Sequence, residues 1–328
     1  MNKCSNLEVR PYQLMCIVCR IGDGMSDDLA DARLAQILRT VRQQPDAPIT
    51  LRCNVDSVYR YQNPGRKEDT PEGELFNDKR DLDVIQKLGL APGATRPARE
   101  LFDRLLKQVP SAAGVCGYDC VTGPDWKGCP RASSGSYEKG RALGLDAIIP
   151  PRGEDEKARA KAESVRAMRQ SDGLCIRPHH LMCMACFWGD GRNVKPIAED
   201  NLYEAIEIIR KNPDVPVRLV AGCCDICPPC SCYDPATRLC VGGNGRGLRD
   251  QKKDLDVLQR LGLRFGDTLP ARELYARLFE TIRSTREICA YDDGVVRGWE
   301  WSICGGPEGN KKYEEARRTG MGFLPAES

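Results

Sequence analysis

The chain repeats a long part of its own sequence, and this internal repeat constrains the fold more than any other feature. "RPYQLMCIVCRIGDG" begins at Arg10 and "RPHHLMCMACFWGDG" begins at Arg177, with nine of fifteen positions identical. Further along, "DLDVIQKLGL" returns as "DLDVLQRLGL" and "VCGYD" returns as "ICAYD", in the same order. The repeated segment is longer than the roughly 20 to 50 residues of a solenoid repeat. We therefore predict one domain-sized fold that occurs twice.

Each copy is predicted to be α/β, with a small sheet, helices and Cys-rich irregular loops. A short strand ("LEVR" or "LCIR") leads into the Cys-x-x-Cys element, which we place in a turn. Apolar residues at helical spacing predict a helix over 27–43 and another over 197–211. A β-rich run, "PITLRCNV" or "PVRLVAG", follows in each copy. We expect the two similar halves to be related by a pseudo-twofold axis.

Two further helices are predicted in each half, over 79–88, 97–108, 252–261 and 270–282. Gly89 and Gly262 are expected to stop the first helix of each pair. The proline of "TRPAREL" is expected in the first turn of the helix that follows.

The repeat also predicts the domain boundaries. We expect the first repeat over 1–150 and the second over 173–328. Between them, 151–172 is predicted to be a charged linker helix, because its Ala, Glu, Lys and Arg content favours an exposed helix.

Composition excludes several classes of protein. The 49 basic and 47 acidic residues nearly cancel, so charge gives no reason to expect nucleic acid or an anionic membrane as a partner. No run approaches the roughly 18 apolar residues of a membrane span. The start, "MNKCSNLEVRPYQ", lacks the apolar stretch of a signal peptide. We therefore expect a cytoplasmic protein.

The chain contains 18 cysteines, and a long cytoplasmic chain uses such clusters for metal more often than for disulfides. The repeat sorts them, because four positions hold cysteine in both copies. The first thiol set is Cys16, Cys19, Cys116 and Cys129. The second thiol set is Cys183, Cys186, Cys289 and Cys304. Four thiolates suit a [4Fe–4S] cluster, a [2Fe–2S] cluster or a tetrahedral zinc ion.

A Cys-rich run occurs in the second copy alone. Within eighteen residues it holds Cys223, Cys224, Cys227, Cys230, Cys232 and Cys240. The close spacing of these cysteines favours an iron–sulfur cluster over a zinc ion, because structural zinc sites commonly use histidine and two separate Cys-x-x-Cys pairs. The glycine-rich segment 242–247 is predicted to be a flexible cover for a cluster, and Cys4 is predicted to be a spare thiol.

The chain's two histidines, His179 and His180, stand just before Cys183. They are candidate catalytic residues, since an imidazole can donate a proton or tune a cluster by hydrogen bonding. A purely structural role in capping the turn is the alternative. The same positions in the first copy hold Tyr12 and Gln13.

The residues 176–263 resemble a family of small bacterial and archaeal proteins of unassigned function, which are suspected iron–sulfur proteins. The resemblance is carried by "IRPHHLMCMACFWGDG", "DICPPCSCYDPATRLC" and "DLDVLQRLGL". It implies one ligand set of Cys183, Cys227, Cys230 and Cys240. This set competes with the second thiol set for Cys183. One partition leaves Cys186, Cys289 and Cys304 as a three-thiolate cluster with an open iron, and the other takes a cluster from the Cys-rich run alone.

The sequence thus predicts two or three [4Fe–4S] clusters per chain, in a protein of redox metabolism that transfers electrons or forms part of a redox enzyme. Its partner would be a redox protein, with no nucleic acid and no membrane. In one alternative, an open iron binds a small-molecule substrate or sulfur, which makes the protein an oxidoreductase or lyase. In another, zinc takes the place of iron–sulfur and stabilises a binding module.

Overall fold

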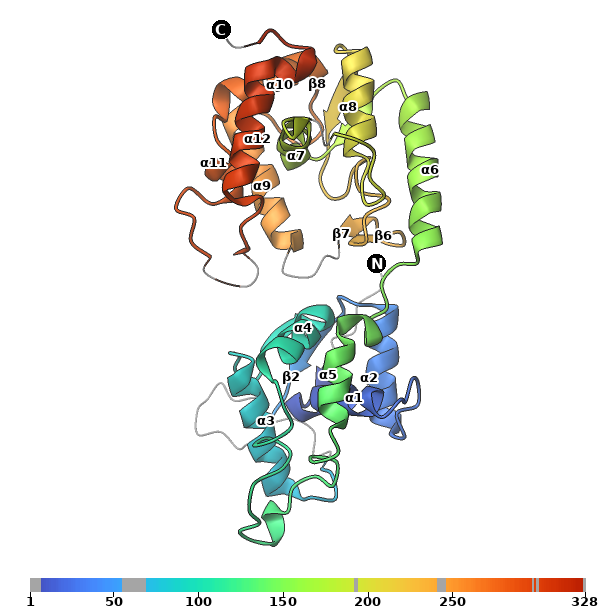
Figure 1. Cartoon of the computed structure of the whole chain (residues 1–328), viewed down its shortest axis with the longest axis vertical. Helices are drawn as coiled ribbons and strands as arrows, with labels where there is room; N and C mark the ends of the chain where they lie inside the picture. The colour runs from blue at the N-terminus through green and yellow to red at the C-terminus, as the bar shows by residue number, and fades with distance from the viewer. Residues whose placement is uncertain are drawn as a thin grey trace. The chain divides into compact units, whose positions relative to one another are not determined.

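The structure is a computed structural model that describes residues 7–54, 69–191, 194–240, 246–296, 298 and 301–326. The chain divides into two compact units, Met1–Pro151 and Arg152–Ser328 (Figure 1). Both combine helices with a small sheet, which confirms the predicted α/β class. No helix among the described residues is long and apolar enough to cross a membrane. Cys4 and most of 242–247 lie outside the described residues.

The first unit contains a three-stranded sheet of order β1-β2-β3. The strands are β1 (Leu7–Val9), β2 (Pro48–Leu51) and β3 (Thr95–Pro97), and β1 is parallel to β2 while β3 is antiparallel to it. The helices are α1 (Pro11–Gly22), α2 (Ala32–Gln43), α3 (Glu74–Lys87), α4 (Ala98–Gln108) and α5 (Ser136–Leu143). Two 3-10 turns, Pro124–Trp126 and Leu145–Ala147, flank α5.

The second unit has the same strand pairing in a sheet of order β4-β5-β8. These strands are β4 (Leu174–Ile176), β5 (Pro216–Leu219) and β8 (Thr268–Pro270), and a separate hairpin joins β6 (Tyr233–Asp234) to β7 (Leu239–Cys240). The helices are α6 (Glu154–Gln170), α7 (Pro178–Trp188), α8 (Leu202–Lys211), α9 (Arg246–Leu261), α10 (Ala271–Thr281), α11 (Arg286–Cys289) and α12 (Gly306–Thr319). A 3-10 turn, Gly320–Gly322, follows α12.

The Cys-x-x-Cys element lies within a helix in both units, so the predicted turn is wrong. α1 begins at Pro11 and α7 begins at Pro178, each two residues after a strand ends. Residues three apart in a helix are neighbours on one face, so Cys16 and Cys19 still present their thiols together. The apolar residues of α1 recur on nearly all of its faces, which is typical of a helix at the centre of a domain.

The third strand of each sheet was not predicted, because its last residue, Pro97 or Pro270, was assigned to the helix that follows. Pro97 and Pro270 end these strands and act as N-caps of α4 and α10, one residue earlier than the predicted first turn. The predicted helix stops are confirmed. Gly89 and Gly262 adopt left-handed φ values of 63° and 64° just beyond α3 and α9.

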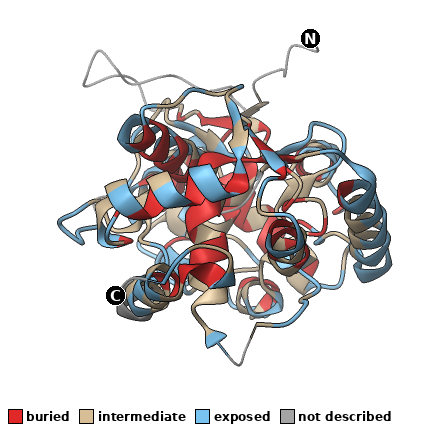
Figure 2. Cartoon of the chain, turned by 90° about the horizontal axis from the view of Figure 1, so that it is seen from above, coloured by how far each residue is buried: buried red, intermediate tan, exposed pale blue. Residues whose placement is uncertain are grey.

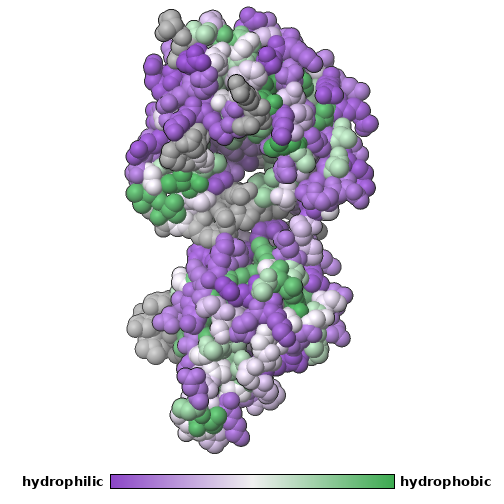
Figure 3. Space-filling view, in the orientation of Figure 1, coloured by the Kyte–Doolittle hydropathy of each residue, from purple (hydrophilic) through white to green (hydrophobic). Residues whose placement is uncertain are grey.

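Each unit has its own hydrophobic core, to which α1 contributes in the first unit and α7 in the second. Figure 2 shows buried residues on the inward faces of the helices and exposed residues on their outer faces. α6 is the most exposed helix of its unit, and Met168 is its only buried residue. Polar side chains cover most of the surface seen in Figure 3.

A buried arginine–aspartate pair joins the start of α1 to α3 in the first unit and the start of α7 to α9 in the second. In the second unit, the Arg177 guanidinium donates to Asp254 at 2.7 and 2.9 Å, and the His179 backbone N–H donates to the same carboxylate at 3.0 Å. Arg10 and Asp81 make the equivalent contact at 2.7 Å in the first unit. The recurring "RP" and "DLDV" segments therefore meet in both units, which fixes α1 on α3 and α7 on α9.

A second fixed contact lies at the C-terminal end of α7. A Cβ atom added at Gly189 would collide with the backbone carbonyl oxygen of Lys312 in α12, so only glycine permits this approach. We expect Gly189→Ala to destabilise the second unit by about 1 to 3 kcal/mol, since the helices must separate. Urea denaturation of the full chain measures this change in the free energy of unfolding.

Gly309→Ala, in the same α12, is the matched control. No atom lies within 4 Å of a Cβ added there. Alanine in an open helical position should therefore stabilise the unit by about 0.5 to 1 kcal/mol. Equal destabilisation by both substitutions would contradict the proposed role of close packing at Gly189.

Candidate functional site

The first thiol set converges on one cavity of about 320 Å³. Cys16 and Cys19 reach it from α1, while Cys116 and Cys129 reach it from the irregular segment between α4 and α5. The Cys129 backbone N–H donates to the Cys116 carbonyl at 2.7 Å, which ties the two distant cysteines together. A cavity of this size lies at the lower end of the roughly 300 to 1,000 Å³ typical of ligand pockets.

The second thiol set converges in the same way. Burial raises the pKa of Cys183, and the charges of Cys304, Cys289 and Cys186 raise it further, which places the four thiols within electrostatic range of one another. The Cys304 backbone N–H donates to the Cys289 carbonyl at 3.2 Å, which matches the bond between Cys129 and Cys116. The structure thus places Cys183 with the cysteines that the repeat assigned to it.

Burial sets the protonation of both sets when no metal is bound. It raises the pKa of Cys16 to about 11, and it raises the pKa values of Cys116 and Cys186 to about 12. These thiols are therefore protonated at neutral pH in the metal-free chain. Since thiolate is the form that binds metal, binding here must release protons.

A buried cation faces each thiol set, a feature that the sequence analysis did not identify. Arg80 lines the first cavity with only 1% of its surface exposed. Among the described residues no carboxylate forms a salt bridge with it, and its Nε has no hydrogen-bond partner. Its guanidinium lies over the Tyr12 ring at 3.8 Å. The positive charge of Arg80 opposes the burial-driven rise in the pKa of Cys16, so the two groups are close.

Lys253 occupies the equivalent position in the second unit. It is also 1% exposed, and its ammonium lies 3.6 Å from Asp250. Burial raises the pKa of Cys289 to about 11, and the charge of Lys253 opposes that rise. The signal in the sequence was the basic residue directly before "DLDV" in both copies.

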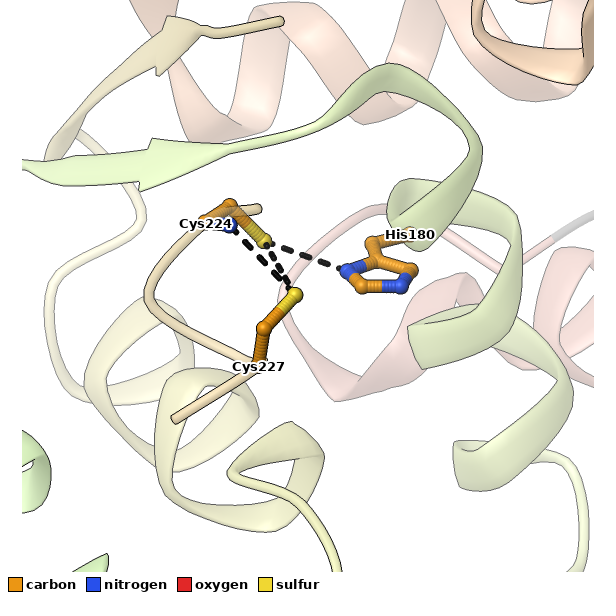
Figure 4. Close-up of side chains that lie close together, drawn as sticks. All are labelled: His180, Cys224 and Cys227. Carbon is orange, nitrogen blue, oxygen red and sulfur yellow. Dashed lines mark hydrogen bonds between the residues drawn. The ribbon is translucent and has the colours of Figure 1, made fainter. Parts of the chain in front are cut away.

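A separate group lies at the start of α7, where His180 meets two cysteines of the Cys-rich run (Figure 4). A hydrogen bond of 3.1 Å joins the His180 Nδ1 atom to the Cys224 Sγ atom, and the Sγ atoms of Cys224 and Cys227 are 3.9 Å apart. All three ligand atoms lie within 4.8 Å of one another. Burial lowers the pKa of His180 to about 4, so its imidazole is neutral at pH 7 and has a lone pair for a metal.

The loop that carries Cys224 and Cys227 is anchored on both sides. The Cys175 backbone N–H in β4 donates to the Asp225 carboxylate at 2.7 Å. In return, the Asp225 backbone N–H donates to the Cys175 carbonyl oxygen at 3.0 Å. The Asn201 side chain donates to the Asp225 carbonyl at 2.8 Å. These bonds position the two thiols before any metal binds.

The remaining cysteines of the run lie around the β6–β7 hairpin. The Cys232 backbone N–H donates to the Cys230 Sγ atom at 3.4 Å, and β7 brings Cys240 opposite Tyr233. The thiol of Cys232 raises the pKa of Cys230 by hydrogen bonding, and burial adds to the rise. The structure thus places Cys224 and Cys227 beside His180 of α7, and Cys230, Cys232 and Cys240 around the hairpin, with Cys223 within electrostatic range of Cys240.

The two histidines have different surroundings. The His179 Nδ1 atom lies 2.7 Å from the Asp254 carboxylate, within the buried arginine–aspartate pair, whereas His180 faces Cys224. The rings are in contact, with centroids 4.5 Å apart. In the first unit, the Gln13 side chain accepts the Arg10 backbone N–H at 3.0 Å instead.

Comparison with known proteins assigns no activity. Residues 199–292 match a family described as a protein of unknown function (DUF1284). The match includes the Cys-rich run and "DLDVLQRLGL" but starts after the motif that begins at Arg177. No curated protein and no solved structure matches the chain. The match therefore supports the expected resemblance to a family of unassigned function over part of the second unit. It does not include the motif that begins at Arg177, and it identifies no metal.

Proposed function

We propose that each unit holds one [4Fe–4S] cluster on its thiol set, and that the protein transfers electrons between redox partners. The observation that carries this proposal is the convergence of four thiols from the same sequence positions in both units. Four cysteine thiolates are the usual ligands of such a cluster.

The buried cations fit an anionic group between the thiols. A buried guanidinium without a counter-charge is unfavourable by several kcal/mol. Arg80 has no carboxylate salt bridge among the described residues, yet it lines the cavity of the first thiol set. Four neutral thiols would leave the guanidinium without an anionic group in contact among the described residues, whereas thiolates that bind a cluster would supply one.

Electron transfer is favoured over substrate binding because both thiol sets supply a cysteine for every iron. An open iron would require Cys183 to join the Cys-rich run, but the thiols that affect its pKa belong to the second set. When bound, a [4Fe–4S] cluster supplies one-electron redox chemistry whose potential depends on nearby charge and hydrogen bonds. Arg80 and Lys253 would raise that potential by stabilising the more negative, reduced state.

We expect protein purified without oxygen to contain about eight iron atoms and about eight labile sulfides per chain, four of each per cluster. Iron and acid-labile sulfide assays measure both numbers, and electron paramagnetic resonance of the reduced protein identifies the cluster type. Zinc at both thiol sets, with no labile sulfide, would disprove the proposal.

A further inference from the structure

We propose that His180, Cys223, Cys224 and Cys227 bind a single zinc ion, at a site separate from the two thiol sets. The site uses none of the eight cysteines assigned to clusters, so it does not depend on them. Three of its ligand atoms already lie within 4.8 Å of one another, from α7 and from the loop after β5.

The distances match one ion better than a cluster. Zinc–sulfur bonds of about 2.3 Å in a tetrahedron place two sulfurs about 3.8 Å apart. The Sγ atoms of Cys224 and Cys227 are 3.9 Å apart. In a [4Fe–4S] cluster each thiolate binds a different iron, so the cluster itself holds the cysteine sulfurs farther apart.

The nitrogen ligand also fits. With zinc–nitrogen bonds of about 2.0 to 2.1 Å, the nitrogen and sulfur of a tetrahedral site are about 3.6 Å apart. The His180 Nδ1 atom and the Cys224 Sγ atom are 3.1 Å apart in a hydrogen bond. Replacing the shared proton with zinc therefore requires the nitrogen and sulfur to move apart by only about half an ångström.

The backbone supports thiolate at Cys227, and a fourth thiol completes the site. The Cys224 backbone N–H donates to the Cys227 Sγ atom at 3.4 Å, which is the bond a metal-bound sulfur accepts (Figure 4). Cys223 directly precedes Cys224 in the loop, beyond the 4.8 Å group, and we assign its thiol as the fourth ligand. One imidazole and three thiolates form a Cys₃His set, which is a typical structural zinc site.

Among its described residues, the first unit has no such group. Its equivalent of His180 is Gln13, whose side chain accepts the Arg10 backbone N–H. Zinc binding is thus specific to the second unit, where it would join the first turn of α7 to the Cys-rich run. One ion per chain is therefore expected rather than two.

Two measurements on the full chain, purified without oxygen, test the proposal: elemental analysis and X-ray absorption spectroscopy at the zinc edge. We expect about one zinc per chain in addition to any iron, with one nitrogen and three sulfurs around the ion. His180→Gln, which installs the residue of the first unit, and Cys224→Ser should each weaken zinc binding at least about 100-fold. Loss of a group that only hydrogen-bonds a metal ligand already lowers metal affinity by about 10- to 100-fold. Competition with a chromogenic chelator measures the affinity.

Cys175→Ser is the matched control, because that thiol is exposed on β4 in the same unit and should leave zinc affinity unchanged. Unchanged circular dichroism and unchanged iron in the variants show that they fold. Zinc retained at full affinity in both ligand variants would overturn the proposal. So would loss of iron and labile sulfide, in place of zinc, from those variants. Absence of clusters at the thiol sets, with zinc still at His180, would reject the proposed function and leave this site intact.

Discussion

Replacing Cys116 with alanine should halve the iron bound to the chain, from about eight atoms to about four. Cys116 and Cys129 close the first thiol set from a segment about 100 residues beyond α1, so no neighbouring cysteine can substitute without moving the backbone. The second unit has its own core and its own thiol set and should keep its cluster. Iron and labile-sulfide assays, with the visible absorption of the cluster, measure the loss.

Cys120→Ala provides the control for this substitution. Cys120 lies four residues after Cys116, but its thiol is exposed and it does not belong to the thiol set. Its iron content should equal that of the parent protein. Cys289→Ala, at the matching position of the second unit, should also halve the iron while leaving zinc bound. Full iron retention in Cys116→Ala would mean that the convergence of the four thiols has another purpose.

Asp254→Ala should destabilise the second unit by about 3 to 5 kcal/mol, because it leaves a buried charge without its partner. Asp254 is fully buried and is the only carboxylate in salt-bridge contact with Arg177 among the described residues. The same substitution removes the acceptors of the His179 ring and backbone N–H. Urea denaturation of the full chain, followed by circular dichroism, measures the change in the free energy of unfolding.

Asp81→Ala should have a smaller effect on the first unit. Its arginine, Arg10, would keep two other carboxylates, those of Asp69 at 2.7 Å and Asp78 at 3.0 Å. Asp256→Ala is a surface control, since its ion pair with Lys252 is partly exposed and should contribute only about 0.3 to 0.5 kcal/mol. Equal losses for Asp254→Ala and Asp256→Ala would show that burial of the pair does not matter.

Much of the fold could be predicted because the signals are local. The helix stops at Gly89 and Gly262 depend on a conformation that glycine adopts easily, and both predictions are confirmed. The Cys-x-x-Cys element was assigned wrongly to a turn, because its cysteines drew more weight than the apolar residues around them. Those residues are buried at helical spacing in α1 and α7. The strands β3 and β8 depend on pairing with distant residues, and their three-residue sequences carry no such information.

The sequence by itself determined which cysteines correspond, because a repeat compares the chain with itself and needs no coordinates. Only the tertiary structure decided how they group. It placed Cys183 with Cys289 and Cys304 and brought Cys224 and Cys227 of the Cys-rich run beside His180. It also gave two adjacent histidines different partners, Asp254 for His179 and Cys224 for His180. Successive side chains of a helix point about 100° apart, so the partner of each is set by whichever distant segment packs on that face.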